Sequence, residues 1–340
     1  MAGDRIGIAL IGAGRAGLIH AANFRSRVPG ALLVAVADPV PAAREAALKT
    51  LEIEKSYSNY IDALADDEID AVVVVVPTAL HKEIVVAAAA AGKHIFCEKP
   101  MAMTEAECEE MIATTSAGGV KLQLGFMRRF DAGYRKAKEA VLSGAIGDVV
   151  MIRSNTRGPS VPQPWMYDLK KSNGPLAEVN SHDIDTLRWF TESEFKTVYA
   201  AGGNYRCPDA KDEWPDFYDN VVVSATFENG MLGAIDGAQG VAYGYDARTE
   251  VLGTRGCVFI GRLQDESVVT CTADSNKGSY PVVRSWRQLY EQAYLAEDTA
   301  FVECIREGRE PEVTGLDGLM AVRVVTAGNA SITGKRVVEL

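Results

Sequence analysis

A chain of 340 residues with 47% hydrophobic and 24% charged side chains has the composition of a soluble globular protein and is long enough for two domains. Its formal net charge of −11 argues against binding to nucleic acids or anionic membranes, because both select a basic protein surface. No apolar run approaches the roughly 20 residues that a membrane-spanning helix needs, so neither a membrane nor a nucleic acid is an expected partner.

The start of the chain and its cysteines predict a cytoplasmic protein. Met1-Ala2-Gly3-Asp4-Arg5 leads directly into a predicted strand, which is not the layout of a secretory signal peptide. The six cysteines are scattered and form no C-x-x-C pair, which is typical of reduced thiols, and we interpret Cys97 as a buried thiol. The four histidines fall in no metal-binding spacing, so no metal site is expected.

The first 125 residues alternate between predicted strands and helices of about ten residues, which is typical of βαβ units around a parallel sheet. The predicted strands span residues 5–11, 32–37, 71–76, 93–97 and 121–125. By the strand numbering of a nucleotide-binding fold, the last two are the fifth and sixth strands of the sheet. The first predicted helix follows the glycine-rich sequence and ends near residue 26, and the others span 41–49, 58–65, 84–91 and 104–115. The last of them begins with a capping box of Thr104 and Glu107.

A glycine-rich sequence follows the first predicted strand and opens the first predicted helix. In that context, Gly12-Ala13-Gly14-Arg15-Ala16-Gly17 predicts a dinucleotide site. Gly12 allows the tight turn, Gly14 lets the backbone approach a pyrophosphate, and Gly17 permits close packing of helix on strand. The amino terminus of the helix then offers N–H groups to the phosphates.

Asp38 ends the second predicted strand and can accept hydrogen bonds from the ribose hydroxyls of the dinucleotide. Its charge would repel the 2′-phosphate of NADP, and the neighbouring Pro39 and Val40 bring no cation. NAD is therefore the predicted cofactor. The alternative is that Asp38 only caps the helix that starts near Pro41.

The sequence Glu98-Lys99-Pro100 leaves the fifth predicted strand at its carboxyl end, where open α/β sheets bind their ligands. Lys99 is therefore predicted to point toward the cofactor crevice, and the alternative is a solvated lysine in a surface turn. The remaining candidate cofactor contacts are Arg15, Ala16, Pro77, Thr78, His81 and Glu98.

Strands dominate the second part of the chain. This pattern predicts a nucleotide-binding Rossmann domain over residues 1–125 and an α+β domain over 126–340 with a large, mostly antiparallel open sheet. The predicted strands span 148–156, 197–204, 220–227, 231–237, 248–252 and 267–272. The predicted helices span 131–142, 286–307 and 316–332, and a further helix begins with the run 178–185 and includes 185–190. An open sheet face is usually covered by self-association, so a homo-oligomer, either a dimer or a tetramer, is expected.

His182 is the one histidine of this second part, and acidic residues flank it. If the run is helical, Glu178 and His182 are i,i+4 neighbours and Asp185 lies one turn further along the same face. A carboxylate beside a histidine can hold one imidazole tautomer and stabilise the imidazolium, as a general base requires. The alternative is a buried histidine that is satisfied by a structural carboxylate.

At this point the chain resembles the Gfo/Idh/MocA oxidoreductase family over nearly its whole length, and within that family the inositol dehydrogenases. The glycine loop is a generic motif, whereas the other motifs that carry the resemblance are specific to the family and occur in its order. They are Glu98-Lys99-Pro100, Gly125-Phe126-Met127-Arg128-Arg129-Phe130-Asp131, His182-Asp183-Ile184-Asp185, Tyr243-Gly244-Tyr245-Asp246 and Val313-Thr314-Gly315-Leu316-Asp317-Gly318.

The resemblance implies that Lys99 contacts substrate and nicotinamide, that His182 acts as the base, and that Asp185 binds substrate hydroxyls. The family pattern D-x-x-x-H-D-x-D begins with Asp, whereas this chain has Glu178, which would orient the reacting groups. Further candidate substrate contacts are Asn173, Arg157 and Tyr243.

The expected reaction is NAD-dependent oxidation of a secondary ring hydroxyl of a cyclic polyol or sugar, with inositol as the first choice. His182 would take the hydroxyl proton, and Lys99 would stabilise the developing alkoxide. The alternatives are a dehydrogenase of an aldose, anhydrosugar or glycoside, a glycosidase that uses NAD transiently, and a non-catalytic sugar sensor. The presence of both Lys99 and His182 favours an enzyme.

Overall fold

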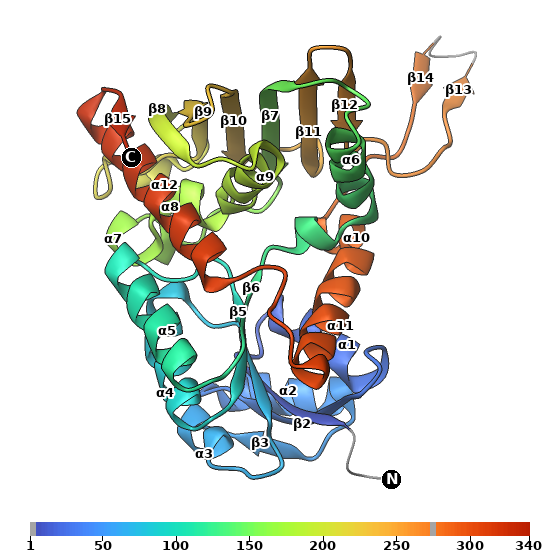
Figure 1. The fold of residues 1–340 in the computed structure, drawn as a ribbon, viewed down its shortest axis with the longest axis vertical. Coiled ribbons are helices and arrows are strands. Elements are labelled where there is room, and N and C mark those ends of the chain that lie inside the picture. Colours follow the sequence, from blue (N-terminus) through green and yellow to red (C-terminus); the bar gives the residue numbers. More distant parts are fainter. Residues whose placement is uncertain (1–4, 273–276) are drawn as a thin grey trace. The chain divides into compact units, whose positions relative to one another are not determined.

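The computed structural model describes residues 5–272 and 277–340, which form two compact units (Figure 1). Unit 1 runs from the first described residue to Phe130 and again over Gln292–Val322, and unit 2 comprises Asp131–Glu291 and Arg323–Leu340. The chain therefore crosses between the units after Phe130, Glu291 and Val322, whereas the predicted division into 1–125 and 126–340 has a single crossing. Within the described residues, no helix has both the length and the apolar composition to cross a membrane.

Unit 1 contains a parallel sheet with the strand order β3-β2-β1-β4-β5-β6, which confirms the predicted Rossmann fold. Its strands are β1 (Ile6–Ile11), β2 (Ala31–Ala37), β3 (Lys55–Tyr57), β4 (Ala71–Val74), β5 (His94–Glu98) and β6 (Leu122–Gly125). The valine-rich β4 is buried along its whole length, as a central parallel strand should be. Strand β3 is the third strand, which the sequence analysis did not locate.

Helices alternate with these strands along the chain. They are α1 (Gly17–Ser26), α2 (Pro41–Leu51), α3 (Tyr60–Leu64), α4 (His81–Ala90) and α5 (Glu105–Ala117), with the 3₁₀ helices η1 (Thr78–Leu80) and η2 (Met127–Phe130). The predicted capping box is confirmed, because Thr104 accepts a hydrogen bond from the backbone of Glu107 and the Glu107 side chain accepts one in return.

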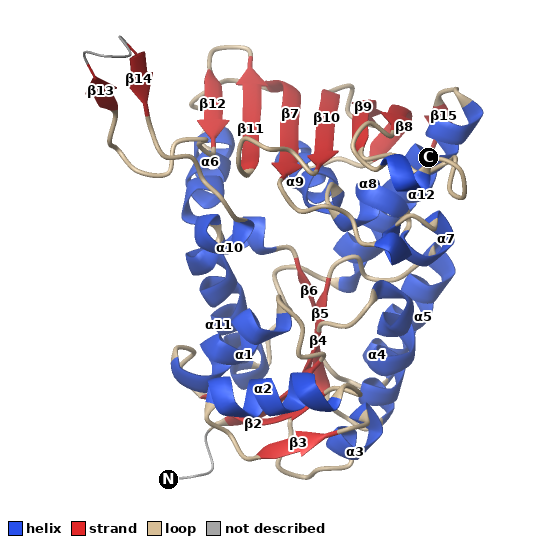
Figure 2. Ribbon diagram, turned by 180° about the vertical axis from the view of Figure 1, so that it is seen from behind, coloured by secondary structure: helices blue, strands red, loops and turns tan. Residues whose placement is uncertain are grey.

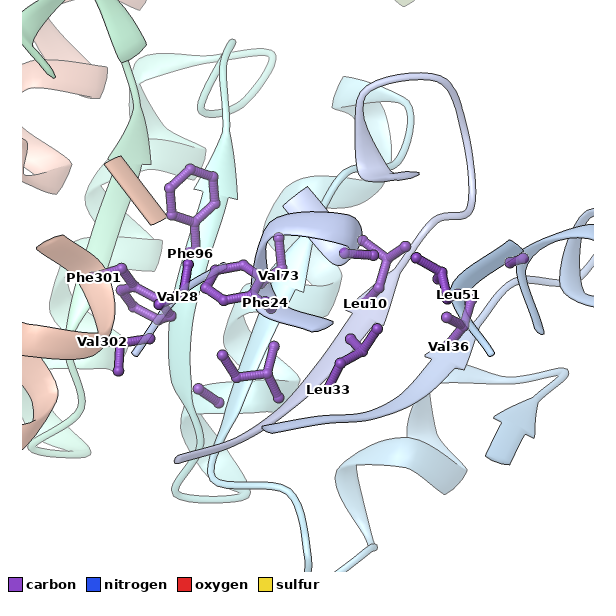
Figure 3. Packing of buried hydrophobic residues seen from close by; sticks show 14 of the residues in the cluster. Leu10, Phe24, Val28, Leu33, Val36, Leu51, Val73, Phe96, Phe301 and Val302 are labelled. Atoms are coloured by element: carbon purple, nitrogen blue, oxygen red, sulfur yellow. The ribbon is translucent and has the colours of Figure 1, made fainter. Parts of the chain in front are cut away.

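Helix α11 (Glu291–Glu307) comes from the far end of the sequence and completes the core of unit 1. Figure 3 shows Phe301 and Val302 of α11 with Phe24 of α1 and Phe96 of β5 in one buried cluster. The ring centroids of Phe96 and Phe301 are 5.8 Å apart. The predicted division assigned this helix to the second domain, but its apolar face is buried in unit 1.

Unit 2 contains a seven-stranded sheet in the order β12-β11-β7-β10-β9-β8-β15 (Figure 2). Its strands are β7 (Val149–Gly158), β8 (Phe195–Gly203), β9 (Asn220–Phe227), β10 (Leu232–Gln239), β11 (Asp246–Gly253), β12 (Cys257–Ile260) and β15 (Val338–Glu339). All neighbours pair antiparallel except β7 and β10, which confirms the predicted mostly antiparallel sheet. The strand predicted over 267–272 is not part of it. It appears as β13 (Thr270–Thr272), which pairs with β14 (Lys277–Ser279) alone.

Helices cover one face of this sheet, where α6 (Ala132–Leu142) contacts β12, α8 (Gly174–Glu178) contacts β10, and α9 (Ser181–Thr191) contacts β7. Side chains of β7 alternate accordingly: Ser154 and Thr156 are buried on the helix side, and Arg153 is exposed on the other side. The remaining helices are α7 (Leu169–Ser172), α10 (Trp286–Leu289) and α12 (Gly315–Gly334).

The prediction that Glu178 and His182 share one helix is wrong. Helix α8 ends at Glu178, and α9 starts at Ser181. The backbone between them includes Asn180, whose side chain fills the space above β10. A Cβ at Gly237 would lie 2.1 Å from Asn180 Oδ1, so the Asn180 side chain can take this position only because residue 237 is a glycine.

Candidate functional site

The three glycines of the loop between β1 and α1 differ in the space around them. Gly12 has φ of +100°, and a Cβ there would lie 2.3 Å from the carbonyl oxygen of Val75. A Cβ at Gly17 would lie 2.2 Å from the carbonyl oxygen of Gly12, whereas a Cβ at Gly14 would meet nothing within 4 Å. The backbone at Gly14 can therefore be approached by a ligand. Arg15 and Ala16 lie between these glycines at the start of α1.

Asp38 is fixed against this loop. Its Oδ2 accepts a hydrogen bond from the N–H of Ala13 at 2.8 Å, and its Oδ1 accepts one from the N–H of Val40 at 2.9 Å. Helix α2 begins at Pro41 with Val40 as its N-cap residue, so Asp38 does not cap that helix. Arg44 Nη1 donates to the carbonyl oxygen of Asp38 at 2.6 Å, which brings a cation close to Asp38 that its sequence neighbours did not indicate.

Pro77, Thr78 and His81 lie after β4, and His81 is buried. The ring of His81 lies between two backbone carbonyls, with Nε2 2.9 Å from Val76 O and Nδ1 2.8 Å from Pro100 O. Burial lowers the pKa of His81, so the neutral ring is favoured, and its single N–H donates to one of these two carbonyl oxygens. His81 thus ties the segment after β4 to Pro100, which follows Lys99 through a cis peptide bond.

Lys99 emerges from the end of β5 between two anchored neighbours. On one side, Pro100 is held by His81. On the other, the buried carboxylate of Glu98 lies 3.2 Å from His20 Nε2 and accepts a hydrogen bond from the N–H of Lys99 at 3.0 Å. The backbone at Lys99 is therefore fixed from both directions.

Two of the sequence motifs also meet in unit 1. Arg129 Nη2 donates to Asp317 Oδ1 at 2.9 Å, and the N–H of Leu124 donates to the carbonyl oxygen of Val313 at 3.1 Å. The segments 125–131 and 313–318 are therefore neighbours in space although they lie far apart in the chain.

In unit 2, His182 and Asp185 lie on the first turns of α9 and are almost completely buried, with His182 8% exposed. Asp183, between them, accepts hydrogen bonds from Ser154 Oγ at 2.6 Å and from Asn180 Nδ2 at 2.8 Å. These bonds fix the start of α9 on β7. Glu178 is half-buried at the end of α8, and the two-residue break places it before this helix.

Asn173 precedes α8 and adopts the left-handed conformation, with φ of +54°. Its carbonyl oxygen accepts a hydrogen bond from Asn329 Nδ2 at 2.9 Å, and Tyr218 Oη donates to Asn329 Oδ1 at 2.7 Å. Tyr218 Oη in turn accepts a hydrogen bond from the N–H of Leu176 at 3.3 Å. The loop that carries Asn173 is therefore held by Tyr218, which precedes β9, and by Asn329 of α12.

Arg157 and Tyr243 lie in an ion-pair network on the sheet face that α9 does not cover. Arg157 Nε and Nη2 donate to the two carboxylate oxygens of Asp236 at 2.6 and 2.8 Å. Tyr243 Oη donates to Asp246 Oδ2 at 3.0 Å. Burial alone would raise the pKa of Asp246, but hydrogen bonds that include those from Arg248 hold it below its usual value. The structure therefore does not bring Arg157 to the face that carries His182.

Several residues that hold the candidate site residues in place were not predicted from the sequence: His20, Asp298, Arg44, Tyr218 and Asn329. His20 could have been found, because it lies one turn after Gly17 on the helix that follows the glycine loop. The others are brought to their sites by tertiary packing, for which the sequence gives no local signal.

Comparisons with known proteins cover both units. Residues 6–126 match the model of an oxidoreductase family with an NAD-binding Rossmann fold, GFO_IDH_MocA, and residues 134–259 match the GFO/IDH/MocA C-terminal domain. The chain is 35% identical to myo-inositol 2-dehydrogenase of Thermotoga maritima, covering 99% of this chain and 98% of that protein. It is 33% identical to scyllo-inositol 2-dehydrogenase (NAD(+)) of Bacillus subtilis, covering 98% of this chain and 95% of that protein.

A solved structure of a relative gives the same picture. The structure of scyllo-inositol dehydrogenase from Lactobacillus casei with bound NAD(H) and scyllo-inositol superposes with a TM-score of 0.89 at 31% identity, covering 98% of this chain and 99% of that one. The predicted resemblance is thereby confirmed over both units. The chain belongs to the Gfo/Idh/MocA family of NAD-binding oxidoreductases.

Proposed function

We propose that this protein is an NAD-dependent inositol dehydrogenase that oxidises a secondary hydroxyl of the ring. The observation that carries the proposal is the pair of buried groups on α9, His182 and Asp185, in a chain whose other unit has an NAD-type glycine loop tied to Asp38. Relatives that match almost the whole chain carry the names of myo- and scyllo-inositol dehydrogenases, which supports the substrate class.

The residues of unit 1 fit NAD. The N–H groups of the loop from Gly12 to Gly17 would hold the pyrophosphate, since the backbone at Gly14 is open to a ligand. Asp38 would accept hydrogen bonds from the ribose hydroxyls. The nicotinamide supplies the hydride acceptor when the cofactor is bound.

Side chains of the protein would accept the hydroxyl proton and stabilise the negative charge on the reacting oxygen. His182 accepts the proton of the reacting hydroxyl, which is the work of a general base. The ammonium group of Lys99 stabilises the negative charge that develops on the oxygen. Glu178 orients these groups from the end of α8.

Neighbouring hydroxyls of the ring would be bound by Asp185 and Asn173. We do not propose Arg157 as a substrate contact, because it lies on the sheet face that α9 does not cover and is paired with Asp236. Tyr243 ranks after Asp185 and Asn173, because its hydroxyl donates to Asp246. A site built from hydrogen-bonding groups rejects analogues that lack the hydroxyls, because its own polar groups are then left unpaired. Simple alcohols and 2-hydroxy acids should therefore be poor substrates.

The test is NADH formation by the purified protein across a panel of inositol isomers, aldoses, anhydrosugars and glycosides. The expected result is the highest kcat/KM for an inositol isomer. If another sugar exceeds every inositol isomer by about tenfold, or 1.4 kcal/mol, the inositol assignment is wrong although a sugar dehydrogenase remains. Glycoside cleavage without net NADH would indicate the glycosidase reaction, and ligand binding without turnover would indicate a sensor.

We also propose that the protein is a cytoplasmic homo-oligomer. The uncovered sheet face exposes apolar side chains between its ion pairs, including Phe259 at 76% exposure, Val222 and Leu232. A second copy would bury this face, as open sheets commonly require. All six cysteines are unpaired, as in a reducing compartment. Sedimentation velocity distinguishes the monomer from the dimer and the tetramer.

A further inference from the structure

Three buried polar side chains of unit 1 form a continuous row: Glu98, His20 and Asp298. His20 Nε2 lies 3.2 Å from Glu98 Oε1, and His20 Nδ1 lies 2.6 Å from Asp298 Oδ1. His20 and Asp298 are 0% exposed, and Glu98 is 6% exposed. The row joins the end of β5, the first turn of α1 and the middle of α11.

Surrounding groups fix each end of the row. Asn23 Nδ2 donates to Asp298 Oδ2 at 2.8 Å, and the N–H of Lys99 donates to Glu98 Oε2 at 3.0 Å. The imidazole ring is packed between aromatic rings, with centroid distances of 4.9 Å to Phe96 and 5.3 Å to Tyr294. Each carboxylate thus has a second hydrogen-bond donor besides the histidine.

The carboxylate of Glu98 occupies space that a glycine leaves open. A Cβ at Gly125, the last residue of β6, would lie 2.9 Å from both Cδ and Oε1 of Glu98. Gly125 has an ordinary backbone conformation that alanine can adopt, so the constraint at this position comes from Glu98 and not from φ.

His20 carries the charge that two carboxylates require. Burial alone would lower its pKa, but the charge of Asp298 and hydrogen bonds to Asp298 and Glu98 raise the pKa of His20 well above its ordinary value. As an imidazolium, the ring donates from both nitrogens at once. It therefore bridges two acceptors that would otherwise repel each other in the core.

We propose that His20 is a positioning residue for Lys99, an inference that rests on the role proposed above for Lys99 at the reacting oxygen. His20 holds one oxygen of Glu98, and the other oxygen of Glu98 holds the peptide N–H from which the Lys99 side chain starts. Helix α1 begins at Gly17 of the glycine loop, so the same ring links the cofactor-binding helix to the end of β5. A displacement of the ammonium group by about 1 Å is enough to lower turnover strongly.

A purely structural role for His20 predicts a different result. A buried ion-pair row that only stabilises unit 1 would, when broken, lower the melting temperature and leave turnover per folded molecule unchanged. If His20 acts by positioning Lys99, its effect on turnover requires the Lys99 side chain. The effect of a change at His20 must then disappear when the Lys99 side chain is absent.

The experiment is a double-mutant cycle on the full-length protein with NAD and the polyol of highest kcat/KM from the panel. The four proteins are the unmodified chain, His20→Gln, Lys99→Ala and the double variant. Glutamine can donate to one carboxylate but cannot bridge both. We expect His20→Gln to lower kcat by about tenfold to a hundredfold in the unmodified chain. In the Lys99→Ala background, we expect a change of less than about twofold.

Two further variants ensure that the test does not rest on His20→Gln alone. Gly125→Ala crowds Oε1 of Glu98, the oxygen that contacts His20, and leaves the imidazole ring itself unchanged. It should show the same dependence on Lys99. Val302→Ala, one turn after Asp298 on α11, removes only a buried apolar contact. It should lower the melting temperature and leave kcat per folded molecule unchanged.

The outcomes separate this proposal from the proposed function. If His20→Gln lowers only the melting temperature and leaves kcat per folded molecule unchanged, His20 is structural and the positioning role is overturned. If the losses in kcat of His20→Gln and Lys99→Ala multiply in the double variant, His20 acts independently of Lys99, and the positioning role is overturned as well. If Lys99→Ala alone keeps a normal kcat, the assigned role of Lys99 fails, and the positioning role fails with it. If His20→Gln does not fold, the same cycle with Gly125→Ala decides between the two.

Discussion

The carboxylate of Asp38 accepts a hydrogen bond from the peptide N–H of Ala13 at 2.8 Å, which ties the end of β2 to the glycine loop. Its other oxygen accepts from the N–H of Val40 at 2.9 Å, so the carboxylate is held in one orientation. A negative charge that is fixed in this way cannot turn aside to admit a phosphate group on the adenosine ribose.

The first prediction is therefore a preference for NAD over NADP of at least about tenfold in kcat/KM, or roughly 1.4 kcal/mol. Asp38→Ser should shrink this preference, because it removes the negative charge while the guanidinium group of Arg44 stays at the carbonyl oxygen of residue 38. Equal kcat/KM values for the two cofactors in the unmodified protein would contradict the role of Asp38.

Two variants separate the charge of Asp38 from its geometry. Asp38→Asn keeps an acceptor for the N–H of Ala13 and removes the charge, so it should also admit NADP. In Asp38→Ser combined with Arg44→Ala, the gain in NADP use should shrink, because the guanidinium group of Arg44 is then removed as well.

The fold of unit 1 was largely predictable because its signals are local. Alternating apolar runs and turns gave the strands, and the context of the glycine loop gave the ligand class. Strand β3 was missed because three residues, Lys55–Tyr57, show no periodicity. The place of α11 in this unit depends on contacts such as that of Phe301 with Phe96, which join segments about 200 residues apart. Neither segment contains a local sequence pattern that predicts this contact.

The residue types of the candidate site were predictable, but their local geometry was not. The spacing of Glu178 and His182 fits a helix, yet the chain breaks between them. At the break, the Asn180 side chain fills the space above Gly237 and donates a hydrogen bond to Asp183. Because Gly237 lies in β10, about 57 residues later in the sequence, tertiary packing overrides the local helical pattern.

The second prediction concerns His182. If it is the general base, His182→Ala should lower kcat by about 10² to 10⁴-fold. The Kd for NAD and the melting temperature should change little, because the glycine loop lies in the other unit. Steady-state kinetics, NAD titration by fluorescence and thermal melts give the three values.

His94→Ala is the matched control for this change. His94 is a half-buried histidine of unit 1 whose Nδ1 accepts a hydrogen bond from the N–H of Lys121, outside the proposed site. It should keep normal turnover per folded molecule. A depressed melting temperature with normal turnover in His182→Ala would indicate a structural histidine instead.

The third prediction concerns the loop that carries Asn173. Asn329→Ala removes the donor to the carbonyl oxygen of Asn173, which holds a left-handed conformation. We expect the KM for the polyol to rise by about fivefold to tenfold, which corresponds to the loss of one hydrogen bond, while the KM for NAD stays unchanged.

Tyr218→Phe tests the same loop by a smaller change. It keeps the ring and removes only the hydroxyl that donates to Asn329 Oδ1. The KM for the polyol should rise in the same direction but by less than in Asn329→Ala. A loss of stability in both variants with no change in this KM would mean that the loop does not contact substrate.

The fourth prediction concerns the stability of unit 2. Ser154 Oγ donates to Asp183 at 2.6 Å and lies 2.9 Å from Thr249 Oγ1 in a buried chain of hydroxyls. Ser154→Ala should lower the free energy of unfolding by about 1 to 3 kcal/mol, because Asp183 loses a donor inside the core. Ser143→Ala, at the exposed end of α6, should stay within about 0.5 kcal/mol of the unmodified chain. Urea unfolding of both variants compares them, and equal stability would contradict the importance of the buried chain.

The last prediction concerns Glu178, which stands where the family pattern has Asp. Its additional methylene extends the carboxylate beyond α8, and this length should set which ring hydroxyls can be accommodated. Glu178→Asp should therefore change the ranking of inositol isomers by kcat/KM, with at least one isomer shifting by about tenfold, or 1.4 kcal/mol. Glu178→Gln keeps the length and removes the charge, so it should lower kcat for all isomers and preserve their ranking. A uniform loss across isomers in Glu178→Asp would mean that the carboxylate acts through its charge alone, and the choice of isomer would then be made by Asp185 and Asn173.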